Sequence, residues 1–109
     1  MKKIIINLND FRTTGSKVFT GRAKGGHVRT ASLIDELENE NEEIKILIPA
    51  DIYSINPSFL EEFLLNVVSK LGALGFHKKF AFENPGEYKI DKDLEEAIER
   101  ILRTENALV

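Results

Sequence analysis

Hydrophobic residues along this chain occur either in short continuous runs or at the spacing of an amphipathic helix. A run at residues 3–8, with three isoleucines at its centre, has the length and β-branched composition of a buried strand. A second run at residues 44–48 ends at Pro49. Alternation at residues 79–82 predicts a third strand, and residues 17–20 predict a short edge strand.

The clearest helix signal lies at residues 57–71, where large apolar residues recur at helical spacing and cover a wide face. Pro57 suits the first helical turn, because an N–H at that position would have no partner in the helix. Asn56 is placed to cap this turn. Gly72 and Gly75 are expected to end the helix.

Two further amphipathic patterns predict helices, one beginning near Gly26 and one over residues 90–102. Strands and helices then alternate along the chain, as is typical of parallel strands backed by helices. We expect a small α/β sandwich, with a mixed or parallel four-stranded sheet backed by about three helices. No long linker divides the chain, so residues 1–109 are expected to form one domain with a short tail at 104–109.

The composition is that of an ordinary globular protein and excludes several classes of protein. Hydrophobic residues make up 42% of the chain and charged residues 30%, which is too apolar for a disordered protein. No apolar stretch approaches the roughly 18 residues of a membrane-spanning helix, and the first isoleucine run is too short for a signal peptide. The lack of cysteine excludes disulfides, thiolate metal sites and a cysteine nucleophile. A cytoplasmic location is expected.

The formal net charge of −3 conceals a segregation of charge along the chain. Residues 11–34 contain five basic and no acidic residues, whereas residues 35–43 contain six acidic and no basic residues. Only Phe11 and Phe19 are available near the basic residues to stack on bases, so nucleic acid is not an expected partner. The acidic residues of this run and of residues 95–99 are interpreted as solvated helix faces.

Residues 12–26 contain four glycines and four basic residues and are expected to form a flexible loop before the first helix. Backbone N–H groups and cations in such a loop can converge on an anion. The candidate anion- or partner-binding residues are Lys17, Arg22, Lys24 and Arg29. The segment has neither a Walker A sequence nor a dinucleotide-binding fingerprint, so a solvated loop whose charges face water is the alternative.

No combination of residue types points to catalysis. Neither histidine has a second histidine or an acid at the spacing of metal ligands, so no metal site is expected. The sequence shows no Ser-His-Asp set and no obvious pair of catalytic carboxylates. The protein is therefore expected not to be an enzyme and to need no cofactor.

Ser58 is a candidate phosphoacceptor at the start of the strongest helix. A phosphate there would meet the positive end of the helix dipole. The alternative is an ordinary serine that caps the helix or faces solvent in its first turn.

Residues 44–72 resemble the core of the STAS-like domain family of unknown function. An apolar strand, a short loop and the helix start Pro57-Ser58-Phe59-Leu60-Glu61-Glu62 follow one another as they do in that family. Gly21-Arg22 before a helix is similar to the N-terminal part of the family. One departure concerns the strand end, where the family often has an acid and an aromatic residue; here the nearest acid is Asp51, in the following loop.

A more distant resemblance links the chain to the anti-sigma-factor antagonist domains of the wider STAS group. Those domains carry a phosphorylatable serine in an Asp-Ser-Ser-Gly turn at the start of the corresponding helix. The stretch Asn56-Pro57-Ser58-Phe59 stands at that place here, so the phosphoacceptor position falls on Pro57 or on Ser58, depending on the register.

The resemblance implies a STAS-like fold and a bacterial, non-enzymatic regulatory module that binds protein partners, among them a histidine-kinase-type ATPase. It implies partner binding through Asp51, Asn56, Ser58 and Glu62, with Ser58 as the switch. The alternative function is a sensor of a small ligand, nucleotide or phosphate that uses the basic segment. A homodimer through an edge strand also stays open.

Overall fold

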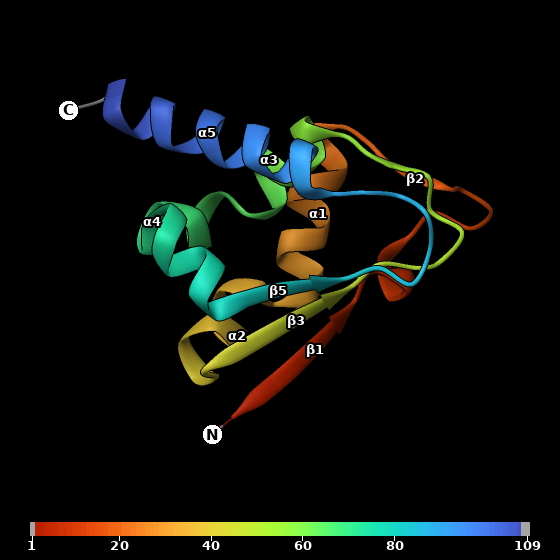
Figure 1. Ribbon diagram of the computed structural model, residues 1–109, viewed down its shortest axis with the longest axis horizontal. Coiled ribbons are helices and arrows are strands. Elements are labelled where there is room, and N and C mark those ends of the chain that lie inside the picture. Colours follow the sequence, from red (N-terminus) through yellow and green to blue (C-terminus); the bar gives the residue numbers. More distant parts are fainter. Residues whose placement is uncertain (1, 108–109) are drawn as a thin grey trace.

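The computed structural model describes residues 2–107 and has the α/β architecture expected from the sequence (Figure 1). In chain order its elements are β1 (Lys3–Asn7), the 3-10 helix η1 (Leu8–Phe11), β2 (Val18–Phe19), α1 (Arg22–Ser32), α2 (Ile34–Glu40), β3 (Glu43–Leu47), β4 (Ser54–Ile55), α3 (Pro57–Phe63), α4 (Leu65–Lys79), β5 (Phe80–Glu83) and α5 (Asp91–Ala107).

Two parallel sheets stand in place of the single four-stranded sheet expected from the sequence. Strands β1, β3 and β5 form a three-stranded sheet in the order β1-β3-β5, and β2 pairs with β4 in a separate two-stranded sheet. Ile46 lies opposite Phe82 in the larger sheet, and Phe19 lies opposite Ile55 in the smaller one. The sequence pattern does not predict β4, a strand of two residues that is defined by its pairing with β2.

The basic, glycine-rich segment does not form one continuous loop. Strand β2 lies within it, and α1 begins at Arg22, four residues before the predicted start near Gly26. The first predicted helix is also broken in two at Leu33, whose φ of 59° lies in the left-handed region. The prediction of a flexible loop over residues 12–26 is therefore wrong for its last five residues.

The predicted helix at residues 57–71 is likewise two helices, α3 and α4, which meet at Leu64. The second of them is interrupted at Gly72 as predicted, because the backbone of Gly72 is not helical and its φ of 73° lies in the left-handed region. Gly75 does not end it, because beyond this kink α4 continues to Lys79 and includes His77. The sequence thus predicts the interruption at Gly72 but not the helical segment that follows it.

Helix α5 extends beyond the predicted residues 90–102 and takes in the predicted tail as far as Ala107. Residues 108–109 of that tail lie outside the described part of the chain. None of the helices within residues 2–107 combines the length and the apolar character needed to cross a membrane.

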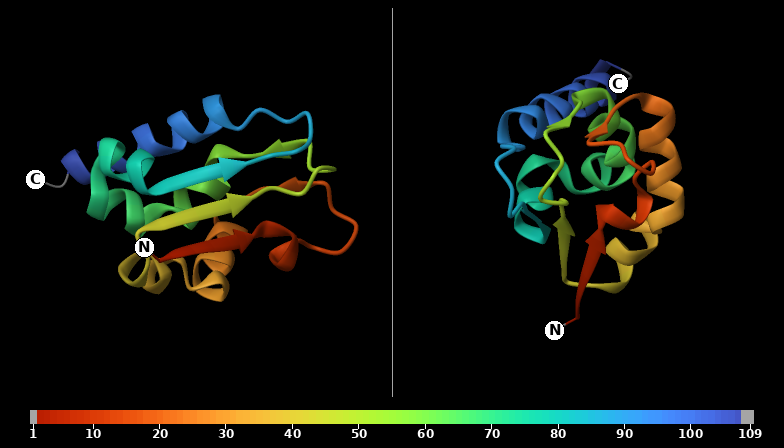
Figure 2. Two further views of the ribbon diagram at one scale, coloured as in Figure 1. Left: turned by 60° about the horizontal axis from the view of Figure 1, so that its bottom comes forward. Right: turned by 90° about the vertical axis from the view of Figure 1, so that its right-hand side faces the viewer.

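The helices cover one face of the three-stranded sheet and leave the other face open (Figure 2). Ile6, Ile44 and Ile46 point to the covered face and are buried, whereas Ile5 and Lys45 point the other way and are exposed. Parallel sheets are usually covered on both faces. The open face is therefore a feature that needs an explanation.

Aromatic residues fill the core between the sheet and the helices. The ring centres of Phe19 and Phe59 are 5.1 Å apart, and those of Phe59 and Phe63 are 5.7 Å apart. Phe76 stacks on Phe80 at 4.7 Å. The first two contacts join the small sheet to α3, the third joins α4 to β5, and both groups belong to one hydrophobic core.

Glu38 departs from the solvated face expected for the acidic run. Its side chain is buried, and its two carboxylate oxygens lie 2.7 Å from Lys70 Nζ and 2.6 Å from Lys79 Nζ. Lys79 also donates to the backbone carbonyl of Glu38 at 2.6 Å. This ion cluster, with the buried carboxylate at its centre, holds α2 against α4.

Candidate functional site

The small sheet places the first turns of α1 and α3 side by side. Strands β2 and β4 run parallel, and the N–H of Asn56 donates to the carbonyl of Phe19 at 2.8 Å just before α3 begins. Helix α1 starts three residues after Phe19. Both helices therefore begin at the same end of the small sheet, as Figure 1 shows.

Close packing between α1 and α3 fixes this arrangement. Gly25 in α1 is buried, and a Cβ there would lie 2.3 Å from the carbonyl oxygen of Phe59 and 2.9 Å from Cβ of Glu62. Only glycine permits such an approach of two helices. The sequence interpretation treats Gly25 as part of a loop, whereas the structure uses its missing side chain at a helix contact.

Asn56 caps α3 as predicted. Its side-chain oxygen accepts a hydrogen bond from the N–H of Ser58 at 2.7 Å, and Pro57 occupies the first helical position. Ser58 follows in the first turn and is half-buried. Because Asn56 makes the cap, the hydroxyl of Ser58 is not required for it.

Glu62 faces α1 and is engaged there. Its carboxylate lies 3.2 Å from the Arg29 guanidinium and 3.9 Å from that of Arg22, which lies 3.1 Å from Glu61. Arg29 also donates to the backbone carbonyl of Glu62. The hydrogen bond to Glu61 is the main cause that raises the pKa of Arg22. The ion pairs of Arg22 and Arg29 are thus internal to the fold.

The other two predicted cations lie elsewhere. Lys17 is exposed in the loop before β2, where its carbonyl accepts a hydrogen bond from the N–H of Tyr53 at 3.0 Å. Lys24 is half-buried on α1. The four residues predicted to bind an anion are therefore divided between a loop lysine, a helix lysine and two arginines that are paired with α3.

Asp51 is held by Arg12. Two hydrogen bonds of 2.8 and 3.0 Å join the guanidinium to the carboxylate, and Arg12 also donates to the carbonyl of Ser16 at 3.2 Å. The hydrogen bond is the largest cause that lowers the pKa of Asp51 and raises that of Arg12. Sequence reasoning missed this pair because its members are 39 positions apart. It ties the loop before β4 to the loop before β2.

Tyr53 is an exposed aromatic residue that sequence reasoning also missed. It is 69% exposed, stands one residue before β4 and lies beside Lys17. A tyrosine two positions after Asp51, in a loop between Pro49 and Asn56, is the signal that could have found it. We call Lys17, Asp51, Tyr53, Asn56 and Ser58 the docking surface.

The loop between β5 and α5 supports the docking surface from the other side. A Cβ at Gly86 would lie 2.2 Å from the carbonyl oxygen of Ala50, so the two loops touch. The Tyr88 hydroxyl lies 2.6 Å from the Asp93 carboxylate and 3.0 Å from the carbonyl of Ile55 in β4. Burial and then Asp93 raise the pKa of this hydroxyl. The docking surface thus rests on a scaffold in which both neighbouring loops are fixed.

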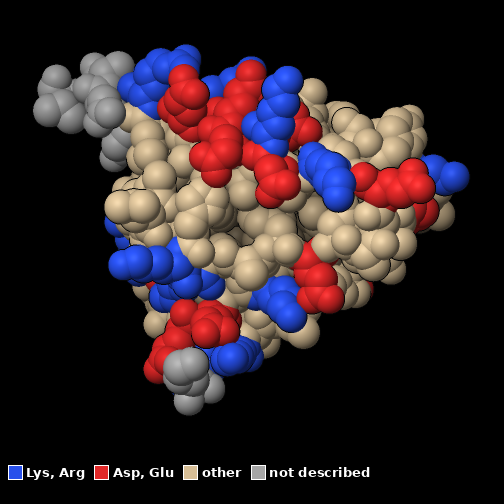
Figure 3. All heavy atoms as spheres, viewed as in Figure 1, with Lys and Arg blue, Asp and Glu red and all other residues tan. Residues whose placement is uncertain are grey.

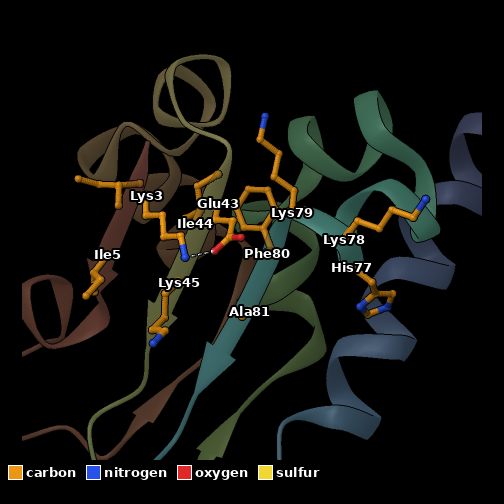
Figure 4. A pocket seen from close by; sticks show the side chains of 11 residues that line it. Lys3, Ile5, Glu43, Ile44, Lys45, His77, Lys78, Lys79, Phe80 and Ala81 are labelled. Carbon is orange, nitrogen blue, oxygen red and sulfur yellow. Dashed lines mark ion pairs between the residues drawn. The ribbon is translucent and has the colours of Figure 1, made fainter. Parts of the chain in front are cut away.

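A separate hollow lies on the open face of the larger sheet, at its junction with the end of α4 (Figure 4). Lys3 of β1 and Glu43 of β3 form an ion pair across it at 3.2 Å. Its other polar side chains are mostly basic, and they include Lys45 and Lys78. Within the described residues, no three His, Asp or Glu side chains are grouped as metal ligands would be.

Comparison of the chain with family models, with curated proteins and with solved structures finds no match in any of the three.

Acidic and basic side chains are interspersed over the face seen in Figure 3. Mixed charge of this kind does not single out a polyanionic ligand. The docking surface is therefore interpreted from its own geometry.

Proposed function

We propose that this protein is a non-enzymatic regulatory module that binds a protein partner through the docking surface. The observation that supports the proposal is the exposure of Tyr53 beside Lys17 and close to Asp51, on loops that are already held in place. Tyrosine supplies a large contact area at a small entropic cost and is enriched at protein interfaces. A prearranged surface also loses little conformational freedom on binding.

We further propose that phosphorylation of Ser58 switches this binding. Residues three and four positions apart share one face of a helix, so Ser58 lies on the α3 face that carries Glu61 and Glu62 one turn on. Both of these carboxylates are paired with Arg22. A phosphate on Ser58 would compete for Arg22 and add about two negative charges beside the docking surface.

The partner proposed from the STAS-like resemblance is a histidine-kinase-type ATPase. In the switching reaction the γ-phosphoryl group of ATP would pass to the Ser58 oxygen, with release of ADP and of the hydroxyl proton. A doubly charged group in a close-packed interface is costly to desolvate. Phosphorylation is therefore expected to release the partner.

The experiment uses a histidine-kinase-type ATPase from the same genome as the binding partner. Isothermal titration calorimetry is expected to show binding that weakens about tenfold or more in Tyr53→Ala, a typical loss for an aromatic interface anchor. Leu74→Ala is the matched control, because Leu74 is 81% exposed on α4, outside the docking surface. Equal binding by both variants and the unchanged protein would contradict the proposed surface.

Phosphorylation is tested separately by incubation with the same ATPase and ATP, followed by fragment mass spectrometry. One phosphate at Ser58, absent from Ser58→Ala, is expected. Phosphate on another residue, or none, would remove the switch from the proposal. A thermal shift with phosphate or nucleotides, lost in Lys17→Ala, would instead favour the small-ligand sensor.

A further inference from the structure

Strand β1 is an edge of the larger sheet, and within residues 2–107 no strand pairs with its outer side. The carbonyl of Lys2 accepts a hydrogen bond from the N–H of Glu42 at 2.8 Å, so the peptide groups of Lys2 point toward β3. Peptide groups alternate in direction along a strand. Those of Lys3 and Ile5 therefore point away from β3, toward an unoccupied edge.

Ile5 makes this edge apolar as well. Its side chain is 59% exposed on the open face of the sheet, and Figure 4 shows it at the margin of that face. Neighbouring Ile4, on the opposite face, is only partly buried. The edge thus combines free peptide groups with incompletely covered isoleucine side chains, which is what a pairing strand requires.

The sequence of β1, Lys-Ile-Ile-Ile-Asn, is complementary to itself in the antiparallel direction. With Ile5 opposite its counterpart in a second copy, Ile4 of one copy lies opposite Ile6 of the other. Lys3 then lies opposite Asn7, so no like charges oppose each other. Lys3 is in addition neutralised within its own chain by Glu43 at 3.2 Å. Cross-strand pairs of β-branched residues stabilise a sheet.

We propose that β1 pairs with β1 of a second copy of this chain, around a two-fold axis at Ile5. The pairing joins two three-stranded sheets into one continuous sheet and removes the exposed β1 edge of each. Two strands of five residues bury less than the roughly 1,200 Å² of a standard stable interface. The dimer is accordingly weak and depends on protein concentration. It presents the docking surface twice, which favours a partner that is itself repeated.

Cysteine cross-linking tests the position of the axis, because the chain contains no cysteine of its own. In a hydrogen-bonded antiparallel pair the Cα atoms are about 5.5 Å apart, within the range that a disulfide spans. Ile5→Cys is therefore expected to form a disulfide-linked dimer under mild oxidation at least about tenfold faster than Ala81→Cys. Ala81 is exposed on the same face but lies on β5, two strands away. Equal rates would overturn the proposal, since face-to-face contact or random collision would produce them.

Sedimentation equilibrium tests the dimer without any cross-link. The dimer fraction of the unchanged protein is expected to rise with concentration. Ile5→Lys is expected to raise the dimer dissociation constant at least about tenfold, because two lysines then meet at the axis. Circular dichroism checks that this exposed substitution leaves the fold intact. A monomer at every concentration up to about 1 mM, or a dimer unaffected by Ile5→Lys, would overturn the proposal.

Discussion

Glu38→Gln is expected to lower the free energy of unfolding by about 2 kcal/mol, because it removes the charge at the centre of a buried ion cluster. Glu38 is 3% exposed, and both carboxylate oxygens are bonded to lysines. Breaking a fully buried pair typically costs about 3 to 5 kcal/mol. The expected loss for Glu38→Gln is smaller, about 2 kcal/mol, because the side chains of Lys70 and Lys79 are 53% and 22% exposed and can be solvated by water once the carboxylate is gone.

The pH dependence of the same variant identifies the charge as the cause. Burial alone would raise the pKa of Glu38, but the hydrogen bonds and charges of Lys70 and Lys79 outweigh it and lower the pKa below its ordinary value of 4.5. The unfolded chain therefore binds a proton at a higher pH than the native protein does. The stabilisation by Glu38 is complete above the unfolded-state pKa and is lost as the pH falls through the lower native pKa.

Urea unfolding at pH 7 and at several lower pH values measures both effects. The matched control is Glu40→Gln, since Glu40 is exposed on the same helix and is expected to change stability by less than about 0.5 kcal/mol. The difference between Glu38→Gln and the unchanged protein is expected to shrink as the pH falls below 4.5. A loss at pH 7 no larger than that of Glu40→Gln, or a loss that does not vary with pH, would refute the electrostatic explanation.

Two other substitutions test contacts that position the docking surface. Gly25→Ala is expected to lower the free energy of unfolding in urea by about 2 kcal/mol or more, because the new Cβ meets the Phe59 carbonyl. The control Gly26→Ala, whose Cβ has room, is expected to raise the free energy of unfolding by about 0.5 kcal/mol. The reverse order would contradict the α1–α3 contact. Arg12→Ala is expected to speed hydrogen exchange at the Tyr53 amide several-fold, and unchanged exchange would show that the Arg12 contacts do not hold this loop.

The sequence predicts best those elements whose own residues decide their structure. The isoleucine runs of β1 and β3 are apolar enough to identify as strands without any knowledge of their neighbours. Asn56 and Pro57 mark the start of α3 for local reasons as well. For elements whose structure is decided by a single segment, the predicted boundaries are therefore correct to within a residue or two.

Elements that depend on contacts between distant segments could not be predicted in this way. Gly25 is helical because α3 packs against it, although glycine by itself disfavours a helix. Strand β4 forms because β2 lies beside it, and Asp51 is neutralised by an arginine far away in the sequence. The docking surface was predicted only in part for the same reason. Its serine and cap can be identified locally, but the pairing of Arg12 with Asp51 cannot.

The segregation of charge along the chain has its explanation in which helices pack together. Arg22 and Arg29 of α1 do not pair with the acidic residues that follow them; they pair with Glu61 and Glu62 of α3. The acidic α2 pairs instead with lysines of α4 through Glu38.

Exchanging these partners would place α1 against α4, whose last turn is basic, and α2 against the acids of α3. Like charges would then oppose each other in both contacts, at a cost that the observed pairing avoids. A chain whose charges alternated evenly would lack this discrimination. The arrangement of charge therefore favours the pairing of α1 with α3 and of α2 with α4, in addition to the hydrophobic core that these helices share. The same pairing of helices accompanies the position of the first turns of α1 and α3, the latter including Ser58, at one end of the small sheet.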